Sequence, residues 1–497
     1  MTLGTGEGAV AGTRKGRESQ MAEKRHQTKA TRREFLEGAG ATAALMLAGQ
    51  RRAALAQGRP QPGAADWPRF GCDLHNTRFN ARETTLGREN VGRLKLKWTF
   101  DAQGRIQTCP TVVGDRLFFG SRDGYLYSLD SATGKLKWKF QVDFQTTLRF
   151  NHWGIRSSCQ YVDGRIYFGD NFTTVHCLDA ASGKEIWQTQ LSKFRDTNML
   201  CSVNVHNGKV LTGYSSDIGN SEIACLDAET GAVAWRFRVV PGTELGGGSV
   251  WTSPAIDEEN DIVYNVTGSV KSYLSPGHML YSESILAHDV DSGELLWYDQ
   301  PNPHDAFDLD FSCHPMIFDA QAPGGYRGKV MRQCVGAGNK AGFFCWNRFT
   351  GELYWKTMLT NQSGSGGPLL NSTAVAYNQI FVVSNALTPR GSMSVTAALN
   401  AYTGDIVWWL PNTAVIRGPV AIANGVFYQG LVDGALQALD SEDGRTLWEY
   451  QLPTAHRGGI AIANGALYTS NGALLGTSEE EEKEHRYSVY AFTIDRA

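Results

Sequence analysis

One short pattern recurs seven times along this chain of 497 residues: a small polar residue and a glycine, with a tryptophan four positions after the glycine. The copies occupy residues 133–138, 182–187, 230–235, 292–297, 350–355, 403–408 and 443–448. Glycine suits a left-handed turn position that other residues reach only with strain. Each copy therefore predicts a tight hairpin turn that opens into a strand, and the recurrence predicts a repeat architecture.

Two further strands precede most copies of the pattern. A short apolar strand that ends in Asp or Asn comes directly before the turn, as at residues 126–130 and 436–440, and that side chain can hydrogen-bond the turn backbone. A strand with aromatic or β-branched residues lies further upstream, as at residues 116–121 and 165–170. One unit is therefore expected to be a four-stranded antiparallel blade with its tryptophan on the outer part.

The two ends of the repeat region complement each other. Trp98 has the setting of an outer-strand tryptophan without a hairpin before it, and the last strand pair, at residues 466–472 and 487–494, has no tryptophan after it. Pairing the first strand with the last blade gives eight blades and removes exposed sheet edges. We therefore expect an all-β, eight-bladed β-propeller of four-stranded antiparallel blades, closed by pairing of the N- and C-terminal strands. An open solenoid is the alternative, and the mismatched ends argue against it.

Composition agrees with a single all-β domain, expected at residues 57–497. The sequence has 55 glycines and 13 tryptophans, and the repeat region shows no helical periodicity. The formal net charge is −3, and no basic patch with interleaved aromatic residues is present. Nucleic acid is therefore not an expected partner.

Residues 1–56 have a different character. The first 30 residues are polar and basic, and the twin arginines Arg32 and Arg33 then precede a short, mildly apolar run. This run is too short and too rich in glycine to span a bilayer, so no transmembrane segment is expected in the mature chain. The stretch resembles a twin-arginine export signal cleaved near Ala56, which predicts a periplasmic or secreted protein. The alternative is a basic, disordered tail.

Nine cysteines are scattered along the chain without a Cys-x-x-Cys pair. This spacing excludes a zinc ribbon and a covalent c-type haem site of the Cys-x-x-Cys-His form. In an oxidising compartment some of them could pair, and the odd number leaves at least one outside any intramolecular pair. Cys177 and Cys225 lie inside expected strands, where a small core residue is the simpler interpretation.

Irregular repeat spacing indicates where a site could lie. Successive tryptophans are 40 residues apart at both ends of the repeat region, but 62 residues separate Trp235 from Trp297 and 58 separate Trp297 from Trp355. Extra length in a propeller is accommodated in loops, and long loops often carry function. A functional site is therefore expected in the two consecutive long gaps.

The loop after Trp297 is rich in carboxylates. His304 is followed closely by Asp305, Asp308 and Asp310. Clustered carboxylates repel one another unless a cation compensates, and such a group of oxygens suits a hard metal such as calcium. A solvated acidic loop is the alternative.

The same two gaps contain an aromatic side chain and a cation. Three glycines at residues 246–248 precede Trp251 and allow close approach of the backbone, and Lys340 precedes a glycine and an aromatic strand. An aromatic face, a cation and a carboxylate cluster together suit a planar anionic cofactor. Taken singly, Trp251 could be a core residue and Lys340 an exposed charge.

At these residues the chain resembles the pyrroloquinoline-quinone (PQQ) dependent alcohol dehydrogenases, most closely the branch that includes polyvinyl-alcohol dehydrogenases. Residues 66–80 are similar to the family's amino-terminal Trp-Pro and Asn-Thr-Arg signature. Residues 303–310 match its Pro-His-Asp-x-aromatic-Asp-x-Asp pattern, with Phe307 where the family usually has Trp. The tryptophan repeats alone also resemble non-catalytic periplasmic assembly scaffolds.

This resemblance assigns roles to particular residues. It implies that Asp308 is the catalytic base and a metal ligand, and that Asp310 is the additional carboxylate of lanthanide-using members. The metal would then be a calcium or lanthanide ion. Trp251 would lie under the plane of PQQ, while Lys340 and Arg156 would hold its oxygens or carboxylates.

The chain departs from the family pattern at three places. No adjacent cysteine pair precedes Arg156, where alcohol dehydrogenases often carry a vicinal disulfide. The family's metal-binding Glu aligns with Asp217, the third expected metal ligand, and its metal-binding Asn aligns with Ser269. The changes at the metal-ligand positions concern the identity of the metal most directly and enzymatic activity less directly.

The resemblance implies an exported PQQ-dependent dehydrogenase that oxidises an alcohol to an aldehyde or ketone. Because no haem motif is present, electrons would leave to an external acceptor such as a periplasmic cytochrome c. The alternative is a non-catalytic periplasmic propeller that serves as a scaffold or binding protein. A third possibility is a hydrolase with a carboxylate pair in the acidic loop, but no other motif in the sequence supports it.

Overall fold

A computed structural model describes residue 60 and residues 63–142, 154–194, 196–216, 221–241, 247–270, 279–303, 309–324, 330–359, 373–388, 391–472 and 486–494. The chain divides into two compact units, Met1–Gln61 and Pro62–Ala497, and the second contains every strand given below. The expected export signal and its cleavage position lie outside the described residues. Within them, no helix has the length and apolar character needed to cross a membrane.

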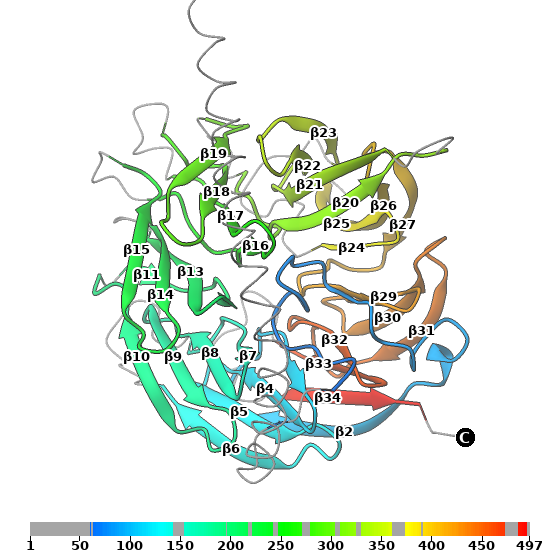
Figure 1. The fold of residues 1–497 in the computed structure, drawn as a ribbon. Helices are drawn as coiled ribbons and strands as arrows, with labels where there is room; N and C mark the ends of the chain where they lie inside the picture. Colours follow the sequence, from blue (N-terminus) through cyan, green and yellow to red (C-terminus); the bar gives the residue numbers. More distant parts are fainter. Residues whose placement is uncertain are drawn as a thin grey trace, which may run out of the picture. The chain divides into compact units, whose positions relative to one another are not determined.

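The second unit is an all-β ring of eight sheets, numbered here as blades 1 to 8 in chain order (Figure 1). Blade 1 contains β3 (Thr111–Val113), β4 (Arg116–Gly120), β5 (Tyr125–Asp130) and β6 (Leu136–Gln141). Blade 2 contains β7 (Gln160–Val162), β8 (Arg165–Gly169), β9 (Thr174–Asp179) and β10 (Glu185–Gln190). Blade 3 contains β12 (Asn204–His206), β13 (Lys209–Ser216), β14 (Glu222–Asp227) and β15 (Val233–Arg238), with β11 (Thr197–Asn198) also paired to β13. Blade 4 contains β16 (Ala255–Asp257), β17 (Ile262–Val266), β18 (Ile285–Asp289) and β19 (Leu295–Asp299).

The remaining blades follow the same plan. Blade 5 contains β20 (Met316–Gln321), β21 (Met331–Gly338), β22 (Gly342–Asn347) and β23 (Leu353–Met358). Blade 6 contains β24 (Ala374–Ala376), β25 (Gln379–Thr388), β26 (Gly391–Asn400) and β27 (Ile406–Asn412). Blade 7 contains β28 (Ala421–Ala423), β29 (Val426–Gly430), β30 (Ala435–Asp440) and β31 (Thr446–Gln451), and β1 (Phe79–Asn80) runs parallel to β28. Blade 8 contains β32 (Ala461–Ala463), β33 (Ala466–Ser470), β34 (Tyr487–Thr493) and β2 (Lys95–Ala102), and the 3-10 turn η1 (Val91–Arg93) precedes β2.

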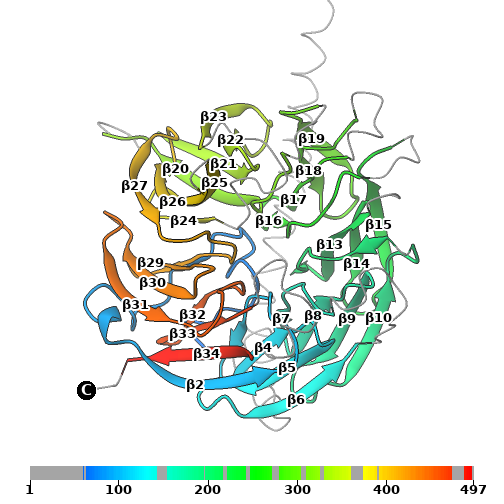
Figure 2. The same ribbon diagram turned by 180° about the vertical axis from the view of Figure 1, so that it is seen from behind.

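Blade 8 closes the ring as the sequence predicts. Its outer strand β2 comes from the N-terminal part of the chain and pairs antiparallel with β34, from Lys95 opposite Thr493 to Ala102 opposite Tyr487. Trp98 therefore belongs to the last blade, and Figure 2 shows β2 beside β34 from behind. The expectation of eight blades closed by N- and C-terminal strands is confirmed.

Strand direction defines two ends of the ring. The first strand of each blade lies on the inside, where first strands of neighbouring blades contact one another. Since successive strands in a blade are antiparallel, the Gly-x-x-x-Trp hairpins between third and fourth strands lie where the first strands end. We call this the turn end, and we call the other end, where the first strands begin, the entry end.

The tryptophans of the repeat join each blade to the next. In all eight blades the indole Nε1 donates a hydrogen bond to a backbone carbonyl of the following blade, with N–O distances of 3.0 to 3.3 Å. The bond from Trp448 to the carbonyl of Leu94 runs from blade 7 to the chain segment that enters β2 and so includes the closing blade in the series. An enclosed indole N–H needs such an acceptor, which explains why a tryptophan recurs at this outer-strand position in every blade.

The repeat glycines are required for two reasons. Gly351, for example, has φ +72°, and a Cβ there would lie 2.6 Å from Cε3 of Trp297 in the preceding blade. Gly134 and Gly404 have the same relation to Trp98 and Trp355. The glycine thus permits both the left-handed turn and the close packing of a tryptophan from the preceding blade.

Replacing Gly351 with alanine is expected to lower the free energy of unfolding by about 2 to 4 kcal/mol, since strain at positive φ and overpacking against Trp297 add together. Gly208 is the matched control, because it has φ +74° but nothing within 4 Å of a Cβ. Its alanine variant should lose only the backbone contribution, about 1 kcal/mol. Urea unfolding of both variants measures the difference, and equal losses would show that packing against the tryptophan is unimportant.

A segment near the N-terminus, residues 65–80, fills the inside of the ring. Its carbonyl groups accept hydrogen bonds from the second residue of the first strand in five blades, at 2.8 to 3.0 Å: Tyr161 to Pro68, Ile256 to Leu74, Ile317 to His75, Val375 to Thr77 and Ile422 to Arg78. In blade 1, Trp67 and Val112 exchange both backbone hydrogen bonds. The first strands have one edge without a strand partner, and this segment supplies the missing acceptors.

Arg78 anchors this segment through hydrogen bonds to backbone carbonyls. Its side chain is fully buried, and its guanidinium donates to the carbonyls of Phe70 (2.6 Å), Val420 and Ile460 (3.2 Å). The guanidinium carbon also lies 4.7 Å from the ring centroid of Phe70. The cation is thus held by carbonyl dipoles and an aromatic face, which joins the segment to blades 7 and 8.

Apolar side chains fill the spaces between neighbouring blades. Cys177 and Cys225 are fully buried among them, as expected from their positions in strands. No disulfide links any two of the nine cysteines, all of which lie in the described part of the chain.

Three histidines whose pKa values are lowered in the folded state make the fold sensitive to acid. Burial lowers the pKa of His288 and of His314 to about 3 and that of His456 to about 4. An exposed histidine in the unfolded chain titrates near 6.5. Below that pH the unfolded state binds protons that the folded state does not, so stability is present above about pH 6.5 and is lost as the pH falls, by roughly 1.4 kcal/mol per pH unit for each histidine.

His288 offers the cleanest test, because neither ring nitrogen has a hydrogen-bond partner among the described residues and the ring packs against Phe237. The substitution His288→Phe should raise the free energy of unfolding, relative to the unchanged protein, by about 2 kcal/mol more at pH 5 than at pH 7.5. Urea titrations at the two pH values measure this. A difference that does not depend on pH would contradict the assignment.

Candidate functional site

Four residues expected from the sequence lie at the entry end of the ring. Trp251 and Arg156 each stand four positions before the first strand of their blades, β16 in blade 4 and β7 in blade 2. Asp310 lies in the segment that enters β20, and Lys340 in the hairpin between β21 and β22, both in blade 5. The antiparallel order of the strands therefore brings all four to one end.

Asp310 and Lys340 form a buried ion pair. The Nζ of Lys340 lies 2.7 Å from Oδ2 of Asp310, and the side chains are 7% and 13% exposed. The other carboxylate oxygen, Oδ1, accepts a hydrogen bond from the backbone N–H of Ser269 in blade 4. The backbone N–H of Lys340 also bonds to the carbonyl of Asp310 at 3.1 Å. The carboxylate is thus fixed between two blades, and Lys340 is not the exposed charge of the alternative interpretation.

Glycines bring the chain before Trp251 close to this ion pair. Gly248 has φ +66° and donates its N–H to the carbonyl of Ser269 at 3.0 Å, while Gly268 donates to the carbonyl of Ser249 at 2.8 Å. A Cβ on Gly268 would collide with Oδ1 of Asp310. Close backbone approach, expected from the glycines, is therefore observed at Gly248, and Gly246 lies outside the described residues.

Trp251 itself carries an unused hydrogen-bond donor. Its side chain is partly buried, and its Nε1 is buried without a hydrogen-bond partner among the described residues. The repeat tryptophans, in contrast, all donate to a carbonyl. A buried, unsatisfied donor on an aromatic face is a feature that a bound ligand explains.

Arg156 contributes positive charge from blade 2, which blade 3 separates from Trp251 in blade 4. Its burial, together with the nearby cations Arg122 and Arg457, lowers its pKa to about 9. A guanidinium among other cations in a buried place favours an anionic ligand, because the anion offsets both the repulsion and the lost hydration.

The expected metal ligands are only partly described. Asp217 and Asp308 lie outside the described residues, as do His304, Asp305 and Phe307. Among the residues that the structure does describe, no three His, Cys, Asp or Glu side chains gather in a way that could hold a metal ion. Asp310 is the one expected metal ligand with a defined position, and Ser269, at the aligned Asn position, contributes its backbone N–H to it.

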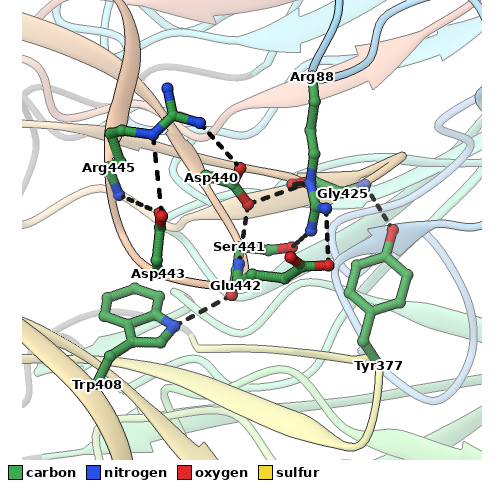
Figure 3. A network of polar contacts seen from close by, with 9 residues as sticks. All are labelled: Arg88, Tyr377, Trp408, Gly425, Asp440, Ser441, Glu442, Asp443 and Arg445. Atoms are coloured by element: carbon green, nitrogen blue, oxygen red, sulfur yellow. Dashed lines mark hydrogen bonds and ion pairs between the residues drawn. The ribbon is translucent and has the colours of Figure 1, made fainter.

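A polar hollow of about 590 Å³ at the turn end has a different character. Figure 3 shows the network of polar contacts beside it, which includes Arg88, Asp440 and Glu442. The hollow is lined by Arg88, Tyr377 and Glu442, among others. Arg88 is paired with Glu442 at 2.7 Å and with Asp440 at 3.1 Å. These contacts tie the segment before η1 to blade 7, and two carboxylates already compensate the charge of Arg88.

Comparison with known proteins gives two family matches. The profile described as glucose/ethanol/alcohol dehydrogenase, beta-propeller domain, matches residues 201–367, which include Trp251, Asp310 and Lys340. The profile of the outer membrane protein assembly factor BamB matches residues 94–209.

Among curated proteins, a polyvinylalcohol dehydrogenase of Pseudomonas sp. is 27% identical over 441 residues, covering 76% of this chain and 66% of the relative. The quinohemoprotein alcohol dehydrogenase ADH-IIG of Pseudomonas putida is 27% identical over 368 residues, covering 64% and 49%. The chain thus spans about half to two thirds of the length of these relatives.

Solved structures share the fold. The quinohemoprotein alcohol dehydrogenase of Comamonas testosteroni superposes with a TM-score of 0.78 at 19% identity, covering 90% of this chain and 84% of that one. A europium-containing methanol dehydrogenase superposes with a TM-score of 0.74 at 17% identity, covering 87% and 98%. With its eight-bladed ring and these sequence matches, the chain is similar to the PQQ-dependent dehydrogenases.

Proposed function

We propose that this protein is an exported PQQ-dependent dehydrogenase that oxidises an alcohol to an aldehyde or ketone. The observation that carries the proposal is the entry end of blades 4 and 5. There Trp251, with its unused indole N–H, lies in the segment that glycines bring against the buried pair of Asp310 and Lys340. This arrangement falls inside the stretch that matches the dehydrogenase profile.

The residues present fit a planar anionic cofactor. Trp251 offers an aromatic face and a free N–H donor, and Lys340 and Arg156 offer cations. Bound PQQ would supply the acceptor for the hydride that leaves the alcohol carbon. In this proposal Trp251 lies under the quinone plane, and Lys340 and Arg156 hold its oxygens or carboxylates.

The protein's own contribution to the reaction is positioning and proton transfer. Asp308 acts as general base and takes the proton of the substrate hydroxyl. Lys340 and the N–H of Ser269 fix the carboxylate of Asp310. Asp308, Asp310 and Asp217 are the proposed ligands of a calcium or lanthanide ion, whose preference is for such oxygen donors.

Export and electron transfer complete the proposal. Residues 1–56 serve as the twin-arginine export segment, and residues 57–497 form the mature propeller in the periplasm or outside the cell. Electrons leave to a separate acceptor such as a periplasmic cytochrome c, since the sequence lacks a Cys-x-x-Cys-His haem site.

Quinone binding tests the proposal directly. Titration of PQQ into the purified chain with calcium or lanthanum should quench tryptophan fluorescence, shift the quinone absorbance band and retain about one metal ion per chain. The substitution Trp251→Leu should weaken quinone binding by about tenfold or more. The matched control is Trp409→Leu, because Trp409 is 62% exposed on the outer strand β27 and should leave binding unchanged.

The second candidate function is a non-catalytic periplasmic scaffold, which the match of residues 94–209 to an assembly-factor profile favours. It requires neither cofactor nor metal. Purified protein that binds no quinone and no metal under these conditions would support the scaffold and reject the dehydrogenase.

A further inference from the structure

Arginines recur at one position of the propeller, and the proposed function uses only one of them, Arg156. This position lies four residues before the first strand of each blade and is occupied in chain order, blade 6 excepted, by Gln107, Arg156, Leu200, Trp251, Ser312, Arg417 and Arg457. In blade 6 the position lies outside the described residues. Three arginines therefore stand at the entry end on blades 2, 7 and 8, at positions equivalent to that of Trp251.

Backbone contacts show that Arg417 and Arg457 lie close together. A Cβ on Gly418, the residue after Arg417, would lie 2.5 Å from the carbonyl oxygen of Gly458, the residue after Arg457. A Cβ on Gly472 would lie 2.9 Å from the Cβ of Arg457 and 3.5 Å from the carbonyl oxygen of Ile106 in the segment that enters blade 1.

The series continues into blades 1 and 2. The N–H of Arg122 donates to the carbonyl of Arg105 at 2.9 Å. The N–H of Ile155, beside Arg156, donates to the carbonyl of Ser121 at 3.0 Å. Five arginines thus follow one another around half of the entry end, and we call them the arginine arc: Arg105, Arg122, Arg156, Arg417 and Arg457.

The arc concentrates positive charge in a partly buried place. Burial, followed by Arg417, Arg105 and Arg122, lowers the pKa of Arg457 to about 10, and burial also lowers that of Arg417. The Nε of Arg457 is buried without a hydrogen-bond partner among the described residues. For Arg417 and Arg457, repulsion and lost hydration would both be offset by an anion that accepts hydrogen bonds from their guanidinium groups.

The arc lies across the ring from the ion pair. Asp310 and Lys340 belong to blade 5, whereas Arg417, Arg457 and the arginines that follow belong to blades 7, 8, 1 and 2. In the proposed function the quinone has its contacts at Trp251, Lys340 and Arg156. Arg417 and Arg457 have no contact with the quinone in this proposal, so they are available to bind a second group at the entry end.

We propose that Arg417 and Arg457 bind the carboxylate group of the substrate, and that the substrate class is an alcohol that carries a carboxylate, such as a hydroxy acid or sugar acid. The planar fork of a guanidinium matches a carboxylate with two parallel hydrogen bonds. The identification of the ligand as a substrate rests on the proposed dehydrogenase function; the anion site itself does not.

Gluconate and sorbitol are the probes, because they share a six-carbon polyol skeleton and differ in the carboxylate. Calorimetric titration of the protein, with and without PQQ and metal, should show binding of gluconate at least about tenfold tighter than that of sorbitol. Arg417→Gln and Arg457→Gln should each weaken gluconate binding by about tenfold and leave sorbitol binding unchanged. Arg445→Gln is the matched control, since Arg445 is 66% exposed at the turn end.

Kinetics and cofactor binding separate the remaining outcomes. The two arc variants should raise KM for gluconate with little change in kcat, and should keep the quinone dissociation constant within about twofold. Equal binding of gluconate and sorbitol would overturn the proposal. Weaker quinone binding with unchanged gluconate binding would also overturn it and assign the arc to the cofactor. Arginine-dependent gluconate binding in a protein that binds no quinone would instead retain the anion site and reject the dehydrogenase function.

Discussion

The variant Asp308→Asn is expected to oxidise alcohols at least about 10³-fold more slowly than the unchanged protein. The amide cannot take the proton of the substrate hydroxyl, and it removes a negative charge from the proposed metal site. Dye-linked assays with PQQ and calcium or lanthanum supplied measure this loss. It should appear in kcat, because the group acts in the chemical step.

Asp305→Asn provides the matched control for this experiment. It removes an equal charge from the same loop, but no catalytic role is proposed for Asp305, so its effect on kcat should be small. Both variants should retain the far-ultraviolet circular dichroism spectrum of the parent. Activity retained in Asp308→Asn would remove this residue from the role of base, whatever the state of the metal.

Arg78→Met should have the largest effect on stability, a loss of more than about 3 kcal/mol in the free energy of unfolding. The substitution leaves the buried carbonyls of Phe70, Val420 and Ile460 without their charged donor. Arg78→Lys should recover only part of this loss, because an ammonium group cannot reach three separated carbonyls as a planar guanidinium does.

Arg82 is the control for Arg78, since it follows four residues later and is exposed. Arg82→Met should change stability by less than about 0.5 kcal/mol. Urea unfolding monitored by tryptophan fluorescence compares the three variants. If Arg78→Met unfolds within about 1 kcal/mol of the parent, residues 65–80 are not an essential part of the ring.

The fold could be predicted from the sequence because the repeat is local. A hairpin turn needs its glycine, and an outer strand needs its tryptophan, within a stretch of six residues. Assigning Trp98 to the last blade required only a count of unmatched ends. The reason for the spacing was not predictable in the same way, because Gly351 packs against Trp297 of the preceding blade, 54 positions away, and not against its own Trp355.

The site was predictable only in part. Trp251, Asp310 and Lys340 were selected because irregular spacing placed them in consecutive long gaps, and Asp310 and Lys340 do form an ion pair. The structure adds the N–H of Ser269 as the second partner of Asp310, which no side-chain pattern could indicate. The cofactor, metal and catalytic roles of all the site residues stay predictions, and Asp308 and Asp217 also lie outside the described residues.

The arginine arc and the segment inside the ring depend on contacts between distant residues. Arg417 and Arg156 are separated by more than half of the chain, and they approach the same side of the entry end only because the ring closes. Once the strands are known, the sequence does show one pattern: Arg156, Arg417 and Arg457 each stand four positions before the first strand of a blade. Residues 66–80 were singled out by resemblance, but their backbone contacts with six blades required the structure.

Ring closure also sets an order of events during folding. Asp101 of β2 and Ser488 of β34, which share a hydrogen bond, are 387 residues apart in the chain. During synthesis β2 is therefore made early and has no strand partner until the last residues have emerged. Contacts at such separation form slowly, and an unfinished ring exposes strand edges at both sides of the gap. Completion of the eighth blade therefore covers these strand edges and removes the risk of aggregation that they carry.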